Sequence, residues 1–230
     1  MKPQRQCQRC GTCCRKGGPI LHGEDLDLVR RGILSLPHLV TIRKGEPAFN
    51  PFLEKIEPTA HEMIKIAGKG ASWECLFYDS ARFSCLIHAD RPIECRLLQC
   101  WDTSAIKAVS GSNCLCRFDL LDSRDPVREQ IILHEEKCPY GKAVHLLQSL
   151  SSPAPPALAL QDLTALMQDD LQLRAKAVEE LRLTLQQELF YFGRPLFQTL
   201  HHPRLRVTFS GETLHLALTQ PAGIHGEAYL

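Results

Sequence analysis

Four cysteines crowd into the first 14 residues as Cys-x-x-Cys-Gly-x-Cys-Cys, and four more follow between residues 75 and 100. The eight are Cys7, Cys10, Cys13, Cys14, Cys75, Cys85, Cys95 and Cys100. Two-residue gaps allow one tight loop to aim successive sulfurs at a common centre, and Gly11 supplies the backbone freedom that such a turn needs. Clustered thiolates are soft donors for zinc or iron. The sequence therefore predicts a metal site with these eight cysteines as ligands.

The whole chain has 230 residues and 11 cysteines, an odd number that excludes a complete intramolecular disulfide framework. Its first residues, Met-Lys-Pro-Gln-Arg-Gln, lack the apolar core of a signal peptide, so we expect a reducing, cytoplasmic setting. Lys plus Arg (27) nearly balance Asp plus Glu (26). The charge balance gives no indication of nucleic-acid binding, and without a run of 18 or more apolar residues we expect no membrane span.

The pattern along the chain predicts an α+β protein in two parts. Residues 1–152 form an irregular, metal-organised cysteine domain with short strands and helices, and the proline-rich stretch 151–157 is the best candidate for a boundary. Residues 153–230 contain no cysteine. Apolar residues at helical spacing predict one long helix over 163–192, and alternation on both sides of Ser210-Gly211 predicts a β-hairpin over 205–218. The helix is a candidate surface for a protein partner or for self-association.

The order and spacing of the thiols resemble a known family. The pattern comprises the first four cysteines, then Cys75-x-Phe77, then Cys85-x-Ile87-x-x-x-Arg91-Pro92-x-x-Cys95-Arg96-x-x-x-Cys100. It is similar to the YkgJ-type cysteine-cluster family, described as zinc- or iron-chelating proteins. The resemblance covers roughly residues 7–101. His88 stands where a tyrosine is expected and Leu98 where an aromatic is frequent, and neither departure touches a thiol.

The number of metal centres stays open on this pattern, because eight thiolates suit two zinc sites, one iron–sulfur cluster with spare cysteines, or two clusters. Neighbouring side chains of an extended backbone point to opposite faces, so Cys13 and Cys14 are not expected to bind one ion side by side. Cys95 and Cys100 lie far apart around an ideal helix, so a shared metal requires a loop or a helix end there. Arg91 and Arg96 flank Cys95 and can donate to coordinated sulfur or simply anchor a turn.

Several other residues are weaker candidates. Cys138-Pro139 fits the distant fourth thiol of a ferredoxin-type run, and His88 can replace one thiolate. Cys114 and Cys116 are more simply small buried hydrophobes. The acidic pairs at 135–136 and 169–170 are interpreted as solvated helix faces.

The thiol pattern is compatible with three alternative functions. The preferred one is an iron–sulfur protein, with a 4Fe–4S cluster, for redox or for accessory or assembly work. The second is a zinc-stabilised binding module without turnover. The third is an enzyme, because flagellin lysine N-methylases carry a similar cysteine cluster on much longer chains. In each case we expect residues 1–152 alone to retain the metal.

Overall fold

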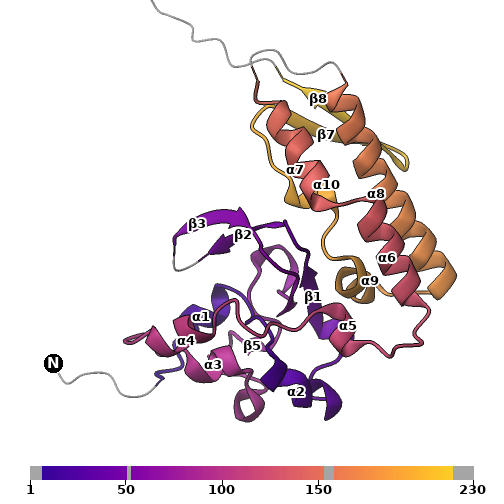
Figure 1. Ribbon diagram of the computed structural model, residues 1–230. Coiled ribbons are helices and arrows are strands. Elements are labelled where there is room, and N and C mark those ends of the chain that lie inside the picture. Colours follow the sequence, from indigo (N-terminus) through magenta and orange to yellow (C-terminus); the bar gives the residue numbers. More distant parts are fainter. Residues whose placement is uncertain (1–6, 51–52, 153–157, 220–230) are drawn as a thin grey trace, which may run out of the picture.

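The computed structural model describes residues 7–50, 53–152 and 158–219, and it shows an α+β protein with helices and short antiparallel strands (Figure 1). In the first half the helices are short: α1 Thr12–Arg15, α2 Leu26–Arg30, α3 Ile93–Leu97, α4 Ser104–Val109 and α5 Arg117–Leu120. The strands there are β1 Leu39–Ile42, β2 Pro47–Asn50, β3 Lys55–Pro58, β4 Met63–Ile66, β5 Tyr78–Asp79 and β6 Ser84–Cys85. Frequent Gly, Pro and Asn breaks keep these elements short.

The second half is built from longer elements. They are α6 Val127–Lys137, α7 Tyr140–Ser149, α8 Ala159–Leu181, α9 Leu185–Phe192, α10 Leu196–Thr199, β7 Leu205–Ser210 and β8 Thr213–Leu218. In Figure 1, α6, α7, α8 and the β7–β8 hairpin form the upper body, and α1, α2, α3, α4 and α5 lie in the lower one. The long helix and the C-terminal hairpin predicted from the sequence are both confirmed.

Each strand of the described residues pairs with one antiparallel partner, in the pairs β1–β4, β2–β3, β5–β6 and β7–β8. Strand β1 lies entirely in the core of the molecule, because all four of its residues are buried. Its sequence Leu-Val-Thr-Ile is β-branched and apolar, as expected for a strand covered on both faces. Leu39 pairs with Ile66 at one end of the ladder and Ile42 pairs with Met63 at the other.

The long apolar stripe is divided into two helices, which corrects the prediction of one helix over 163–192. Helix α8 ends at Leu181, and Arg182 adopts a left-handed conformation with a φ of 51°. Thr184 then caps α9 by accepting a hydrogen bond from the Gln187 backbone at 3.3 Å, while the Gln187 side chain accepts one from the Thr184 backbone at 2.9 Å. This Thr-x-x-Gln capping box was legible in the sequence. Gly193 ends α9 as predicted.

Two hydrophobic clusters form the core. The first joins β1, β4 and Cys75 with Phe190, Tyr191 and Phe192 of α9. The second joins α7, α8 and the β7–β8 hairpin and includes Cys138. Helix α9 therefore packs on strand β1 and buries its aromatic residues in the same cluster as part of the cysteine site. The proposed boundary at 152 adjoins residues 153–157, which lie outside the described residues.

Candidate metal centre

The first cysteine loop is shaped by Gly11 and by helix α1. Gly11 has a φ of 74°, and its carbonyl accepts the Arg15 backbone N–H at 2.9 Å. A β-carbon at Gly11 would lie 1.9 Å from the hydroxyl oxygen of Tyr78. Only glycine fits this position, because it has both the left-handed conformation and a neighbour in direct contact.

Cys13 and Cys14 lie within helix α1, so the extended backbone assumed from the sequence is not what the structure shows. Their sulfurs are 3.9 Å apart. Successive residues of a helix point about 100° apart, so the two side chains can face different surroundings while remaining neighbours. Cys14 packs against the first hydrophobic cluster. Adjacency in sequence therefore does not by itself keep the two sulfurs apart.

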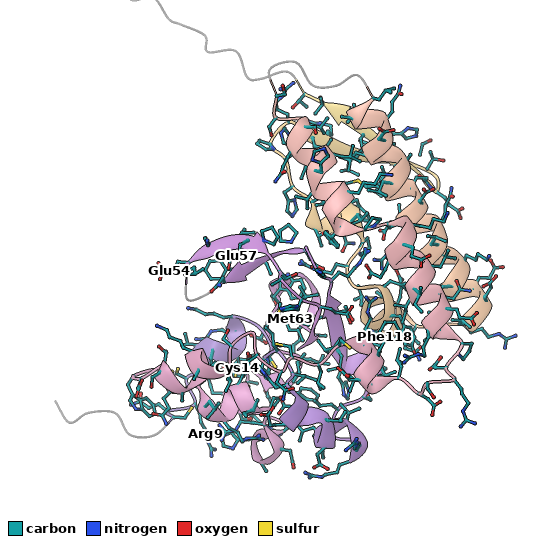
Figure 2. The ribbon with its side chains drawn as sticks, viewed as in Figure 1. Arg9, Cys14, Glu54, Glu57, Met63 and Phe118 are labelled. Carbon is teal, nitrogen blue, oxygen red and sulfur yellow. The ribbon has the colours of Figure 1, made fainter. Side chains whose placement is uncertain are left out.

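Backbone pairing brings Cys75 and Cys85 to this loop. The Cys75 N–H donates to the Cys14 carbonyl at 2.8 Å, and the Tyr78 N–H donates to the Cys75 carbonyl at 2.9 Å. Tyr78 then pairs with Cys85 across β5–β6. Three cysteines that are distant in sequence are thus joined by hydrogen bonds that need no metal. Figure 2 shows the side chain of Cys14 in the lower part of the molecule.

Cys95 and Cys100 are positioned by helix α3 and the turn that follows it. The Ile93 N–H donates to Asp25 at 2.8 Å, and the Glu94 carboxylate accepts the Ile20 N–H at 2.9 Å, so α3 is fixed to the segment after the cysteine loop. The helix ends at Leu97. Cys100 therefore lies outside regular helix, as shared ligation with Cys95 would require.

The eight thiols influence one another electrostatically. Burial and the neighbouring thiols of Cys13, Cys10 and Cys7 raise the pKa of Cys100. Burial and the thiols of Cys75, Cys13 and Cys85 raise the pKa of Cys95. The contact with Cys14 lowers the pKa of Cys13 to about 6. The same contact raises the pKa of Cys14, with Cys75 and Cys95 adding to the effect. The structure thus brings all eight predicted ligands into one region.

These thiols share a region without being in close contact as a group. In the described part of the chain, no three of their sulfurs lie within 4.8 Å of one another. Exposure also differs among them: Cys7, Cys10 and Cys100 are exposed, Cys75 is buried, and the other four are intermediate.

Cationic groups surround the thiols and suit a negatively charged thiolate centre. The Arg91 Nε is buried and has no hydrogen-bond partner, and the positive charge of Arg91 contributes to the lowered pKa of Cys13. A metal-bound thiolate or sulfide would supply the acceptor that this donor lacks. Lys65 is buried near Cys75 and Cys95 and donates to the Gly18 carbonyl. The residues present therefore fit a thiolate-bound metal.

The weaker candidates have different surroundings. Cys138 lies in the second hydrophobic cluster, away from the eight thiols, and its thiol contacts the Leu166 carbonyl at 3.9 Å. Cys116 directly precedes helix α5, and Cys114 forms an isolated bridge with His22; both are half-buried, not buried as predicted. His88 lies near Arg9 and Arg91; burial and these two charges lower its pKa.

A second group of potential ligands, which sequence reasoning did not assemble, lies between α6 and α8. One ligand atom each from His134, Cys138 and Asp170 lies within 4.8 Å of the others, and all three residues are buried. The Asp170 carboxylate already accepts hydrogen bonds from His134 at 2.7 Å, from Arg174 at 3.0 Å and from the Leu196 N–H at 3.0 Å. A carboxylate with three donors, one of them a guanidinium, is a poor ligand for a dication. We interpret this group as part of the buried ion network.

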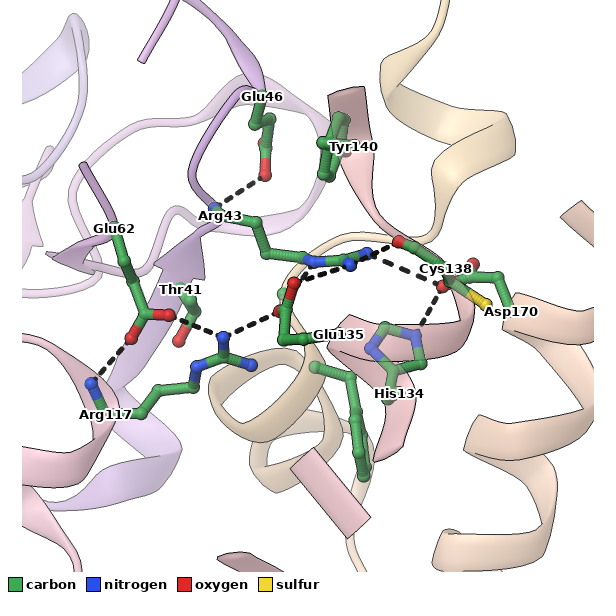
Figure 3. A network of polar contacts seen from close by, with 12 residues as sticks. Thr41, Arg43, Glu46, Glu62, Arg117, His134, Glu135, Cys138, Tyr140 and Asp170 are labelled. Carbon is green, nitrogen blue, oxygen red and sulfur yellow. Dashed lines mark hydrogen bonds and ion pairs between the residues drawn. The ribbon is translucent and has the colours of Figure 1, made fainter. Parts of the chain in front are cut away.

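That ion network connects the two halves of the molecule (Figure 3). Arg43 donates twice to Glu135, at 2.8 Å each, and also to the Cys138 carbonyl at 2.6 Å. Arg117 also binds Glu135, at 2.7 Å. Asp170 is therefore bound in the interior, and Glu135, half-buried, is bound by two buried arginines. The prediction that both acidic pairs face solvent is wrong for Asp170 and holds only in part for Glu135. The apolar residues beside them on their helices could have indicated, from the sequence, that these carboxylates lie against the rest of the protein.

The clustered thiols suit the chelation of a metal. Residues 6–117 match the model of the CxxCxxCC family, whose description reads "Putative zinc- or iron-chelating domain". The match confirms the resemblance seen in the thiol pattern and contains all eight cysteines. No curated protein and no solved structure matches the chain. Within the described residues, no helix has the length and apolar character needed to cross a bilayer.

Proposed function

We propose that this protein holds an iron–sulfur centre on the eight clustered thiols and uses it in redox or assembly work. The spacing of the sulfurs supports iron–sulfur over zinc. Zn–S bonds of about 2.3 Å in a tetrahedron place ligand sulfurs about 3.8 Å apart. In a 4Fe–4S cluster each thiolate binds a different iron, so the sulfurs are farther apart. Among the described sulfurs, only Cys13 and Cys14 are in contact near the zinc spacing, at 3.9 Å, and no three lie within 4.8 Å, which suits the larger object.

The surroundings of the thiols support the same assignment. Hydrogen bonds to cluster sulfurs and nearby positive charge tune the reduction potential of iron–sulfur centres. Arg91 offers a buried donor without a partner, and Lys65 is a buried cation close to two of the thiols. These groups offset the negative charge that four thiolates bring to a centre.

Zinc-based stabilisation is the second candidate, and one observation favours it. Cys75 belongs to the hydrophobic core, and Cys14 and Cys85 pack against that core, as ligands of a structural metal would. A metal there would contribute on the order of 10 kcal/mol to folding.

Purification of the full chain without oxygen tests the proposal. We expect brown protein with iron and acid-labile sulfide in equal amounts, and an electron paramagnetic resonance signal after reduction. Cys114→Ser serves as a control and should leave iron and sulfide unchanged. Colourless protein with stoichiometric zinc and no sulfide would replace the proposal by the zinc-stabilised module.

A further inference from the structure

We propose that the eight thiols form two separate four-thiolate centres that differ in access to solvent. The inner centre comprises Cys14, Cys75, Cys85 and Cys95, and the outer centre comprises Cys7, Cys10, Cys13 and Cys100. The outer centre exchanges its metal with the surroundings, and the inner centre retains it. This inference rests on the proposed metal binding, but it does not depend on whether the metal is iron or zinc.

The inner group is defined by packing and by backbone hydrogen bonds. Cys75 is part of the first hydrophobic cluster, and Cys14 and Cys85 pack against it. The bond from the Cys75 N–H to the Cys14 carbonyl and the Tyr78–Cys85 pairing fix these three positions. Cys95 lies on α3, which Asp25 and Glu94 anchor to neighbouring backbone. Every inner thiol is therefore carried by a segment whose position is fixed without metal.

The outer group lies on the solvent side of the same region. Cys7, Cys10 and Cys100 are exposed, and they come from the N-terminal loop and from the turn after α3. Cys13 is half-buried and does not pack against the first hydrophobic cluster, although its neighbour Cys14 does.

The difference in access has a chemical consequence. Metal transfer between thiolate sites proceeds by substitution: an incoming ligand forms a bond to the metal as one protein thiolate leaves, with no change in oxidation state. That exchange requires an approach path to the metal and a ligand that can move away. Exposed Cys7, Cys10 and Cys100 offer both. Cys75, sealed in the core, offers neither.

The test counts metal in the full chain and in matched single substitutions. Cys7→Ser and Cys100→Ser remove exposed outer ligands, Cys85→Ser removes an inner one, and Cys114→Ser is the control. Each protein is purified without oxygen for iron, zinc and sulfide analysis. The same chains are stripped of metal, titrated with Zn²⁺ and examined by native mass spectrometry before and after exposure to a chelator.

Two centres predict that Cys7→Ser and Cys100→Ser each hold half the metal of the unsubstituted chain. They also predict that the chelator removes half the metal from the unsubstituted chain and none of what the two outer variants retain. Complete loss of metal in either outer variant would show one shared centre, and full retention in both would make these cysteines spare; either result overturns the inference. These two variants decide the question even if Cys85→Ser fails to fold. Two zinc ions in place of iron would refute the proposed function and leave this inference standing.

Discussion

Polar groups in the cysteine region and polar groups in the buried ion network are arranged in opposite ways. In the network, Arg43, Arg117 and Arg174 are almost fully buried, and each guanidinium donates to carboxylates or carbonyls, although Arg43 Nη1 and Arg117 Nε have no hydrogen-bond partner. In the cysteine region, eight like groups gather, with the Cys13 and Cys14 sulfurs 3.9 Å apart and no three of the described sulfurs within 4.8 Å. The opposite charges of the network stabilise one another. Backbone hydrogen bonds position the cysteine segments, and a bound metal would join their sulfurs.

The buried ion network stabilises the fold, whereas the candidate metal ligands lie in the cysteine region. The network joins β1 and α5 from the first half to α6, α8 and α9 from the second: Arg117 donates to the Tyr191 carbonyl, and Arg174 donates to the Phe192 carbonyl at 2.7 Å. The apolar stripe of α8 supplies Leu163, Leu166 and Met167 to the second hydrophobic cluster. Those residues serve the intramolecular core, and self-association through this helix stays a prediction.

Asp170→Asn should have the largest effect. Loss of the carboxylate charge removes the buried counter-charge that Arg174 and the nearby Arg43 share, and leaves only the more exposed Glu188 and Glu135 as their partners. Breaking a buried ion pair in this way typically costs about 3–5 kcal/mol. Denaturant unfolding of metal-loaded protein measures the loss. Asp169→Asn is the matched control, because Asp169 is exposed and its change should stay within about 0.5 kcal/mol. Equal effects at both positions would contradict the role given to the network.

Acid should destabilise the buried ion network through His134 and Asp170. Burial, with Arg43 and Arg174 nearby, lowers the pKa of His134 to about 4 from its ordinary 6.5. Arg174 and the hydrogen bond from His134 outweigh burial and lower the pKa of Asp170 to about 2. Since Asp170 is therefore ionised and His134 neutral, His134 donates from Nε2.

Between pH 6.5 and about 4, His134 is protonated in the unfolded chain and neutral in the folded chain. Stability is therefore full above pH 6.5 and falls as pH decreases through this window, by about 3 kcal/mol in total. Unfolding measured from pH 7 to 5 tests the slope, and His134→Gln should flatten it. An unchanged slope in that variant would mean that another group titrates. Asp170 adds its own loss only below about pH 4.

Arg91→Lys tests the cysteine region, because it keeps the charge and removes the Nε donor. If Arg91 donates to a metal-bound sulfur, metal affinity should fall about 10- to 100-fold, as for other groups that hydrogen-bond to ligands. Competition with a chelator measures the change, and a shifted reduction potential would accompany it. Arg82→Lys is the control, since the Arg82 side chain is 82% exposed. An unchanged metal affinity in Arg91→Lys would show that Arg91 only anchors a turn.

The smallest effect is expected from Gly111→Ala, which is compared with Gly11→Ala. Both glycines have left-handed φ values, 74° and 72°, so backbone strain costs about 1–2 kcal/mol in each substitution. Only Gly11 has Tyr78 in the way of a β-carbon, because no atom lies within 4 Å of that position at Gly111. Chelator-induced metal release should accelerate in Gly11→Ala alone. Equal release rates would show that the contact with Tyr78 does not hold the loop.

Local patterns in the sequence predicted much of the fold. Alternation around Ser210-Gly211 predicted the hairpin, Pro126 and Cys138-Pro139 predicted the limits of α6, and the thiol spacing predicted the family. The break at residues 182–184 was also present in the sequence as a capping box, but continuous apolar periodicity obscured it. Periodicity reports which face is buried and does not report whether one helix or two bury it.

What the sequence alone determined is the ligand chemistry: eight soft donors, their order and the glycine that turns their loop. Tertiary structure decided which thiols are exposed and which lie in the core, and it also decided that the buried Asp170 and the half-buried Glu135 meet arginines from other segments. The physical reason is that a residue's chemistry is set by its own atoms. Its burial, its partners and its pKa depend on segments that are distant in the chain, and no local pattern records them.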